Sequence, residues 1–321
     1  MRDEEATADD PTSPEPAADL GAGYRSPQRR PAATIALLVA VLAATVWELA
    51  TYGLSPSAPN LARAGGSSLG AFAHNGWWKL LGANFLHGGI VHVASNTIVL
   101  LIIGATLERE VGRRVLLAVV AWSLLGTSLG ALALSGDTVS VGASGICFAL
   151  MGAGFVADPH RRTALGQQAW GLLPINVILT FAVPHISIGG HVGGLAAGVI
   201  VGYVTCTRHA APRAPIWGST MLAFGVAACA STVLVPVVLA HTAPRTMQQV
   251  DGALVRPSLE RQLRTSLVSG GVREQVSRAA CRSVRGSAAS WECSVTADAG
   301  RGTYSFVYGD DDSWSGRRIG G

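Results

Sequence analysis

The sequence predicts an all-α protein that crosses a membrane several times, followed by a small, mainly-β C-terminal module. Hydrophobic residues make up 49% of the 321 residues and charged residues only 14%, whereas soluble domains carry about 25% charged residues. The mean hydropathy is positive, at +0.36. Apolar runs of about 20 residues, the length that spans a bilayer, alternate with short charged or Gly/Pro-rich breaks. The net charge of +4 is small and dispersed, so no nucleic-acid partner is expected.

The elements follow one another in a simple order. The first 31 residues are rich in Asp, Glu, Pro and Ala, which predicts a disordered tail. Residues 241–321 predict a polar module, in which 290–295 and 303–308 alternate between apolar and polar residues as strands do. Its Cys281 and Cys293 suit one disulfide if the module faces an oxidising compartment. Between tail and module, seven apolar runs predict seven spans, at 32–51, 85–107, 114–134, 143–157, 168–184, 187–206 and 217–240.

The distribution of Lys and Arg predicts the orientation of the spans. On one side of the membrane the loops carry only Arg63 and Lys79. We therefore expect a cytoplasmic N-terminus and an external C-terminal module, in a cell membrane of bacterial plasma-membrane type. The other side carries ten basic residues: Arg25, Arg29, Arg30, Arg109, Arg113, Arg114, Arg161, Arg162, Arg208 and Arg213.

The short fourth span brings polar residues to one depth. At about 15 residues and ~1.5 Å per residue it cannot cross the full hydrocarbon thickness. Its outer end, at Ser144, is therefore expected to lie below the outer surface. His191 opens the sixth span from the same side, and His92 and Asn96 lie in the outer part of the second. Loop 135–142 has to reach the recessed end of the fourth span. Non-helical backbone at such depth must be buried or line a water-filled cavity.

Ser144 and His191 suit nucleophilic catalysis. A serine needs a base to accept its proton, and histidine is the usual base near neutral pH. Gly142 and Gly145 let backbone approach the serine closely, and the helix N-terminus there supplies N–H groups for a developing oxyanion. His92 and Asn96, one turn apart on one helix face, can donate hydrogen bonds to it. No carboxylate is suitably placed to act as a third catalytic residue beside Ser144 and His191, which favours a catalytic dyad over a triad.

Each feature also has a simpler explanation. Gly142 to Gly145 can be a small-residue packing patch with an ordinary serine. The His92 and Asn96 pair can be an interhelical polar contact, and His191 can be a satisfied core histidine. Their joint occurrence on one side and at one depth favours catalysis.

Several motifs resemble the rhomboid family of intramembrane serine proteases and appear in that family's order over roughly residues 30–206. They are Trp78-Lys79, Phe85-Leu86-His87-Gly88-Gly89, His92-x-x-x-Asn96, Gly104-x-x-x-Glu108-Arg109, Gly142-Ala143-Ser144-Gly145 and His191-x-x-Gly194-x-x-x-Gly198. The resemblance implies a six-helix protease core over 32–206. A linker and a seventh helix over 207–240 would follow it.

The resemblance also implies a role for each matching residue. Ser144 matches the nucleophile and His191 the general base, while His92 and Asn96 help the Ser144 N–H to hold the oxyanion. Two departures are Lys79, where the family often has Arg, and Phe148, where many members have a Tyr that stacks on the histidine. Phe148 retains the ring, so the stacking should survive. The supporting matches are His87 as a structural histidine, Glu108 as an anchor for the cytoplasmic end of the second span, and Gly194 and Gly198 as close helix contacts.

We therefore expect a serine endopeptidase that cleaves transmembrane proteins near the outer membrane boundary through an acyl-enzyme. Single-span membrane proteins are the expected substrates, the lipid bilayer is the expected surroundings, and no cofactor or metal is expected. The oligomeric state is left open. The main alternative is a catalytically inactive rhomboid-like protein that binds membrane clients. A transporter or a zinc hydrolase fits less well, because the sequence has no obvious inverted repeat and no His-Glu-x-x-His pattern.

Overall fold

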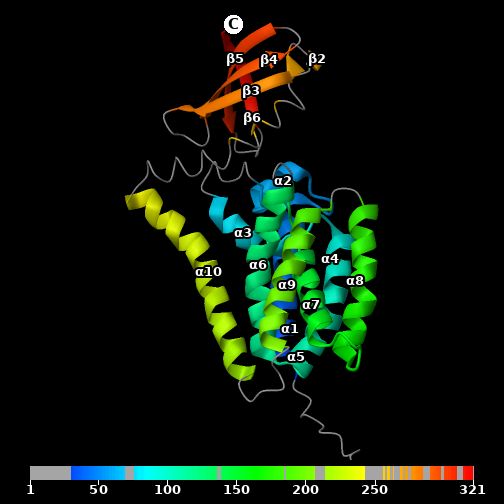
Figure 1. Cartoon of the computed structure of the whole chain (residues 1–321). Helices are drawn as coiled ribbons and strands as arrows, with labels where there is room; N and C mark the ends of the chain where they lie inside the picture. The colour runs from blue at the N-terminus through cyan, green and yellow to red at the C-terminus, as the bar shows by residue number, and fades with distance from the viewer. Residues whose placement is uncertain are drawn as a thin grey trace, which may run out of the picture. The chain divides into compact units, whose positions relative to one another are not determined.

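The computed structural model is mostly helical and has a small antiparallel sheet near the C-terminus (Figure 1). The predicted tail lies almost wholly outside the described residues, as do parts of the C-terminal module. The structure describes residues 30–68, 76–135, 139–183, 186–206, 214–242, 256, 259–260, 263, 268–269, 272–273, 276–284, 290–297, 300–308 and 314–320.

Within these residues, five helical segments are long and apolar enough to cross a membrane. They lie in α1 (Ala32–Tyr52), the continuous α4 (Ile90–Val99), π-helical turn (Leu100–Gly104) and α5 (Ala105–Glu110), α6 (Arg113–Ser135), α9 (Ile188–Cys206) and α10 (Ala214–Thr242). The predicted multi-pass membrane fold is thereby confirmed.

Two further helices complete the bundle. The first, α7 (Ser144–Ala157), is apolar but has only 14 residues. The second, α8 (Ala164–Ala182), contains Gln167, Gln168 and Asn176, which lower its hydropathy. The assignment of six core spans plus one therefore stays a prediction. Between α1 and α4 lie α2 (Ala58–Ala64), a 3₁₀ turn (Gly76–Trp78), α3 (Lys79–Gly82) and a second 3₁₀ turn (Ala83–Phe85).

The short helix α7 occupies the centre of the bundle. Every residue from Gly145 to Gly154 is buried, as expected for a helix that is apolar on all sides. Helices α6, α8 and α9 and the π-helical turn pack around it, and Figure 1 shows α7 between its longer neighbours. Fourteen residues at ~1.5 Å each span about 21 Å, less than the ~30 Å hydrocarbon core.

Glycines allow α6, α7 and α9 to pack with their backbones in contact. A Cβ added to Gly194 would collide with the carbonyl of Gly145, and one added to Gly198 would collide with the carbonyl of Ala149. On the other side of α9, Gly193 and Gly126 meet in the same way. Small residues at such positions are typical of helix pairs in membranes.

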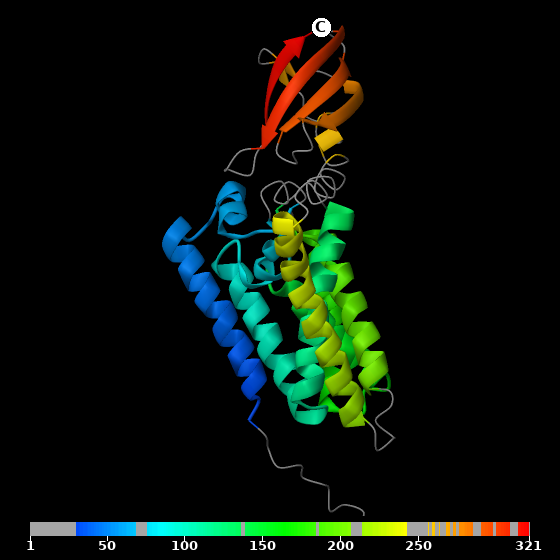
Figure 2. The same cartoon turned by 90° about the vertical axis from the view of Figure 1, so that its left-hand side faces the viewer.

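The start of α1 is capped by a side chain from α5. The Glu108 carboxylate accepts hydrogen bonds from the N–H groups of Ala33 (3.0 Å) and Thr34 (2.8 Å) and from the Thr34 hydroxyl (2.8 Å). These amides have no acceptor within their own helix. Figure 2 shows α1 running along the edge of the bundle, where this cap holds its first turn.

The C-terminal module contains a four-stranded antiparallel sheet in the order β3 (Val276–Ser283), β4 (Ser290–Ala297), β5 (Gly300–Tyr308) and β6 (Trp314–Gly320), and a short pair of β1 (Val268–Ser269) and β2 (Val272–Arg273). The strands predicted at 290–295 and 303–308 are confirmed as the paired β4 and β5. Cys281 and Cys293 are opposite each other on β3 and β4, and a disulfide joins them. The buried face of the sheet consists of Ala279, Cys281, Trp291, Cys293, Val295, Tyr304 and Phe306, with Leu259 and Leu263 against it.

Candidate active site

The structure brings Ser144 and His191 into contact. Nε2 of His191 lies 2.8 Å from Oγ of Ser144. Ser144 is the first residue of α7, and His191 lies in the first turn of α9. The ring of Phe148, one turn after Ser144, stacks on His191 with a centroid distance of 4.3 Å and an interplanar angle of 22°. The stacking expected for Phe148 is therefore present.

Backbone packing holds the two side chains together. Gly194, one turn after His191, lies against the carbonyl of Gly145. Gly198 repeats this contact one turn further along, at Ala149. Because neither contact leaves room for a side chain, the relative position of α7 and α9 is closely defined at the end where Ser144 and His191 meet.

His92 and Asn96 border the backbone just before Ser144. Gly142 has a φ of +123°, and a Cβ added there would lie 2.6 Å from Cε1 and 2.8 Å from Nε2 of His92. The same Cβ would lie 3.7 Å from the Asn96 amide nitrogen. Both side chains of α4 therefore lie on the approach to the N-terminus of α7, where an oxyanion next to Ser144 would form.

A buried network around His87 orients Asn96. Nε2 of His87 accepts hydrogen bonds from the Asn96 amide (3.1 Å) and the Ala143 N–H (3.4 Å). Its Nδ1 lies 3.1 Å from the Thr45 hydroxyl, which donates its own proton to the Val41 carbonyl (2.9 Å). Because that hydroxyl has one proton, Nδ1 carries a hydrogen and donates it.

The side chain of Glu48 also takes part in this network. Its Oε2 accepts a hydrogen bond of 2.7 Å from the His87 N–H, and the residue is fully buried in α1. Sequence reasoning identified His87 as structural but missed Thr45 and Glu48. A carboxylate inside an apolar run was the signal that could have identified Glu48. No comparable signal marked Thr45.

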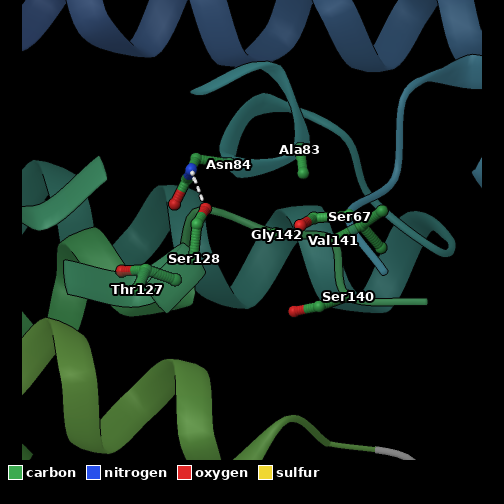
Figure 3. Close-up of a pocket in the computed structure, with 8 residues that line it drawn as sticks. All are labelled: Ser67, Ala83, Asn84, Thr127, Ser128, Ser140, Val141 and Gly142. Carbon is green, nitrogen blue, oxygen red and sulfur yellow. Dashed lines mark hydrogen bonds between the residues drawn. The ribbon is translucent and has the colours of Figure 1, made fainter. Parts of the chain in front are cut away.

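A small polar cavity lies beside Gly142 (Figure 3). The Asn84 amide donates to the Ser128 hydroxyl across 3.3 Å, as the figure shows. Oγ of Ser67, Oδ1 of Asn84 and Oγ1 of Thr127 are buried and make no hydrogen bond within the described part of the chain. Sequence reasoning missed these residues, because single hydroxyl and amide groups are common in helices. The complete lining is Ser67, Ala83, Asn84, Thr127, Ser128, Ser140, Val141 and Gly142.

The remaining motif residues also have defined contacts. Lys79 donates a hydrogen bond of 2.8 Å to the Ala62 carbonyl, which ties α3 to α2. Gly145 lies against the Thr127 side chain. Among the described residues, no group of three His, Cys, Asp or Glu side chains is placed to hold a metal ion.

Comparison with known proteins shows what this part of the chain is similar to. Residues 74–208 match the Rhomboid domain family. This part of the chain is a rhomboid domain. It is also 54% identical over 35 residues to RHOMBOID-like protein 4 of Arabidopsis thaliana. That segment covers 11% of this chain and 9% of the relative, so the similarity spans only a small part of either protein.

The rhomboid domain contains every residue of the candidate site that the sequence motifs indicated, from His87 to His191. It does not contain α1, which contributes Thr45 and Glu48 to the network around His87. The C-terminal sheet also lies outside the matched residues.

Proposed function

We propose that this rhomboid protein is an intramembrane serine endopeptidase in which Ser144 is the nucleophile and His191 the general base. One observation carries the proposal: the 2.8 Å contact between Oγ of Ser144 and Nε2 of His191. A serine activated in this way at the N-terminus of a buried helix is suited to acyl transfer.

In the first step, Oγ of Ser144 attacks the carbonyl carbon of a substrate peptide bond while its proton passes to Nε2 of His191. The N–H of Ser144 and the side chains of His92 and Asn96 donate hydrogen bonds to the oxygen that becomes negative. His191 then gives its proton to the leaving amine, and the C–N bond breaks. The C-terminal segment of the substrate leaves with a new amino group, and the N-terminal segment stays bound to Ser144 as an ester through its carbonyl carbon.

Hydrolysis of this ester needs water inside the bilayer. The cavity beside Gly142 has three buried oxygens, on Ser67, Asn84 and Thr127, that are suited to bind water. A water molecule from this side attacks the ester carbonyl while His191 accepts its proton. The proton then returns to Oγ of Ser144 as the acid product leaves.

The proposed substrate class comes from the resemblance to rhomboid proteases. We propose single-span membrane proteins whose helices unwind locally near the outer boundary, because the carbonyls of an intact helix are shielded from attack. In this scheme residues 32–206 form the protease core, 207–240 a linker and seventh span, and 241–321 an external module. The N-terminal tail would then be cytoplasmic.

The decisive experiment compares purified wild type with Ser144→Ala and His191→Ala. Each is offered a fluorescent transmembrane peptide and, separately, a fluorophosphonate that labels activated serines. Both variants should lose at least about a thousandfold in kcat, because dyad members act as a unit. Ser231→Ala and His160→Ala, which alter exposed residues, are the matched controls and should behave like wild type.

Two outcomes would contradict the proposal. One is a Ser144→Ala variant that still cleaves; the other is a wild type that neither cleaves nor becomes labelled. A wild type that binds membrane clients but does not cleave them would support the client-binding alternative.

The proposed orientation has its own test. After reduction, a thiol reagent confined to the outside of cells should label Cys281 and Cys293. Labelling of these cysteines only from the cytoplasmic side would reverse the proposed topology without affecting the proposed chemistry.

A further inference from the structure

The general base has a second hydrogen-bond partner that no motif indicated. Nδ1 of His191, the ring nitrogen that faces away from Ser144, lies 2.7 Å from the hydroxyl oxygen of Thr180. Thr180 is in the last turn of α8. The imidazole therefore bridges two hydroxyl groups, one on α7 and one on α8.

The direction of this hydrogen bond follows from proton counting. The Thr180 hydroxyl donates its only proton to the carbonyl of Asn176, four residues earlier, at 2.7 Å. Its oxygen must then accept from Nδ1–H of His191. Nε2 is left without a hydrogen and presents its lone pair to the Ser144 hydroxyl, which is the arrangement that proton transfer requires.

The same arrangement occurs at His87, where the tautomer is independently defined. There Thr45 donates to the carbonyl four residues earlier and lies next to Nδ1, while two donors point at Nε2. Two donors at Nε2 require an unprotonated Nε2 and a hydrogen on Nδ1. A back-bonded threonine thus serves as an acceptor for a histidine at two places in this protein.

Thr180 lies on the buried face of α8, where its hydroxyl contacts His191. Thr180 is only 6% exposed, whereas its neighbours Leu179 and Phe181 are 46% and 72% exposed. The last turn of α8 therefore turns this hydroxyl inward and its large apolar side chains outward.

We propose that Thr180 is a positioning residue that fixes His191 in the tautomer with a hydrogen on Nδ1. It takes the place that a carboxylate occupies in a triad, and it supplies orientation without bringing a charge into the membrane. When His191 accepts the serine proton, Nδ1–H keeps its acceptor, so the ring need not turn. The inference rests on the proposed function, because it assigns His191 as the base.

The first test measures the tautomer directly and needs no activity. The full-length chain is labelled with ¹⁵N-histidine in detergent micelles, and the His191 signals are identified by their loss in His191→Ala. In wild type, Nδ1 should give the signal of a protonated nitrogen and Nε2 that of an unprotonated one. In Thr180→Val, which keeps the shape but removes the acceptor, the two nitrogens should show a mixture of tautomers.

The second test is kinetic. We expect Thr180→Val to lower kcat and the fluorophosphonate labelling rate by about tenfold, the effect of losing one hydrogen bond, with KM unchanged. Thr180→Ser should restore both the tautomer and the rate. Thr205→Val is the matched control: Thr205 is also buried and also donates to the carbonyl four residues earlier, at Val201.

The outcomes separate the inference from the proposed function. A Thr180→Val protein with the wild-type tautomer would overturn the inference, whatever its activity. A Thr180→Ser variant that fails to restore the tautomer would do the same. If wild-type His191 shows the expected tautomer but the protein is inactive towards peptide and fluorophosphonate, the proposed function fails while the positioning role of Thr180 stands.

Discussion

At the scale of single residues, the site depends on Gly142. Its φ of +123° is a conformation that only glycine adopts without strain, and His92 fills the space where a side chain would project. Gly142→Ala should therefore displace His92 and the backbone that leads to Ser144. We expect kcat to fall at least tenfold, measured with the transmembrane peptide.

Gly171→Ala is the control for this change. Gly171 lies in α8 with nothing within 4 Å of an added Cβ, so alanine should be neutral or slightly stabilising. If Gly142→Ala cleaves as well as Gly171→Ala does, the proposed oxyanion geometry is wrong.

Individual residues of the site differ in how far the sequence indicated them. Ser144 and His191 were recognisable because two reactive groups at one depth in the membrane are costly. Thr180 and Thr45 were not, since threonines within helices most often satisfy their own backbone. Only the distances to His191 and His87 reveal that their oxygens accept hydrogen bonds from a second residue.

At the scale of elements, the start of α1 depends on Glu108. Its carboxylate accepts three hydrogen bonds from Ala33 and Thr34. Glu108→Gln removes the charge and one of the acceptor oxygens, so we expect a loss of about 1–2 kcal/mol in the free energy of unfolding, the size of a lost helix cap. Unfolding in detergent measures it.

The matched control is Glu110→Gln on the same helix. Glu110 is exposed and accepts one hydrogen bond, 3.3 Å from the Leu165 N–H, which a glutamine oxygen can replace. Equal stabilities for the two variants would show that the cap on α1 contributes nothing.

The contact between α7 and α9 is a second element-scale test. Gly198→Val places a branched side chain against the Ala149 backbone and should push the helices apart, separating His191 from Ser144. We expect a loss of about 2 kcal/mol or more in unfolding free energy, because overpacking at a tight contact is costly, together with loss of fluorophosphonate labelling. Ala196→Val introduces the same residue at an exposed position of α9 and should change neither.

Elements of the C-terminal sheet show where sequence patterns fail. The strands β4 and β5 were predictable, because Trp291, Val295 and Phe306 alternate with polar residues. The strands β3 and β6 were not, because most residues of β3 are Ala, Ser, Arg or Cys, and five of the seven residues of β6 are Gly, Ser or Arg. Such residues have weak strand preference, and pairing with β4 and β5 decides their conformation.

At the scale of the whole molecule, the Cys281–Cys293 disulfide should matter to the module and not to the helices. The bond closes a loop of 12 residues, which corresponds to about 3 kcal/mol, and the core of the module is small. Reducing the full-length protein should therefore expose the C-terminal part to limited proteolysis, while helical circular dichroism stays unchanged.

The double variant Cys281→Ser with Cys293→Ser should behave like the reduced protein. Cleavage of the peptide by this variant reports separately whether the module influences the protease. If reduction leaves the module resistant to proteolysis, its hydrophobic core alone is sufficient for its stability.

The amino-acid sequence alone was enough to predict a multi-pass membrane protein with a rhomboid domain, because apolar run lengths and motif order are properties of the chain. It also indicated that the fourth span is too short to cross the bilayer, so that its outer end at Ser144 lies below the surface. The position of this helix, α7, at the centre of the bundle came from the structure. The hydrogen-bond partners of the site residues, by contrast, became visible only in the folded structure. The contacts of His191 with Ser144 and Thr180 join three helices, and such distances depend on how closely glycine-lined backbones pack.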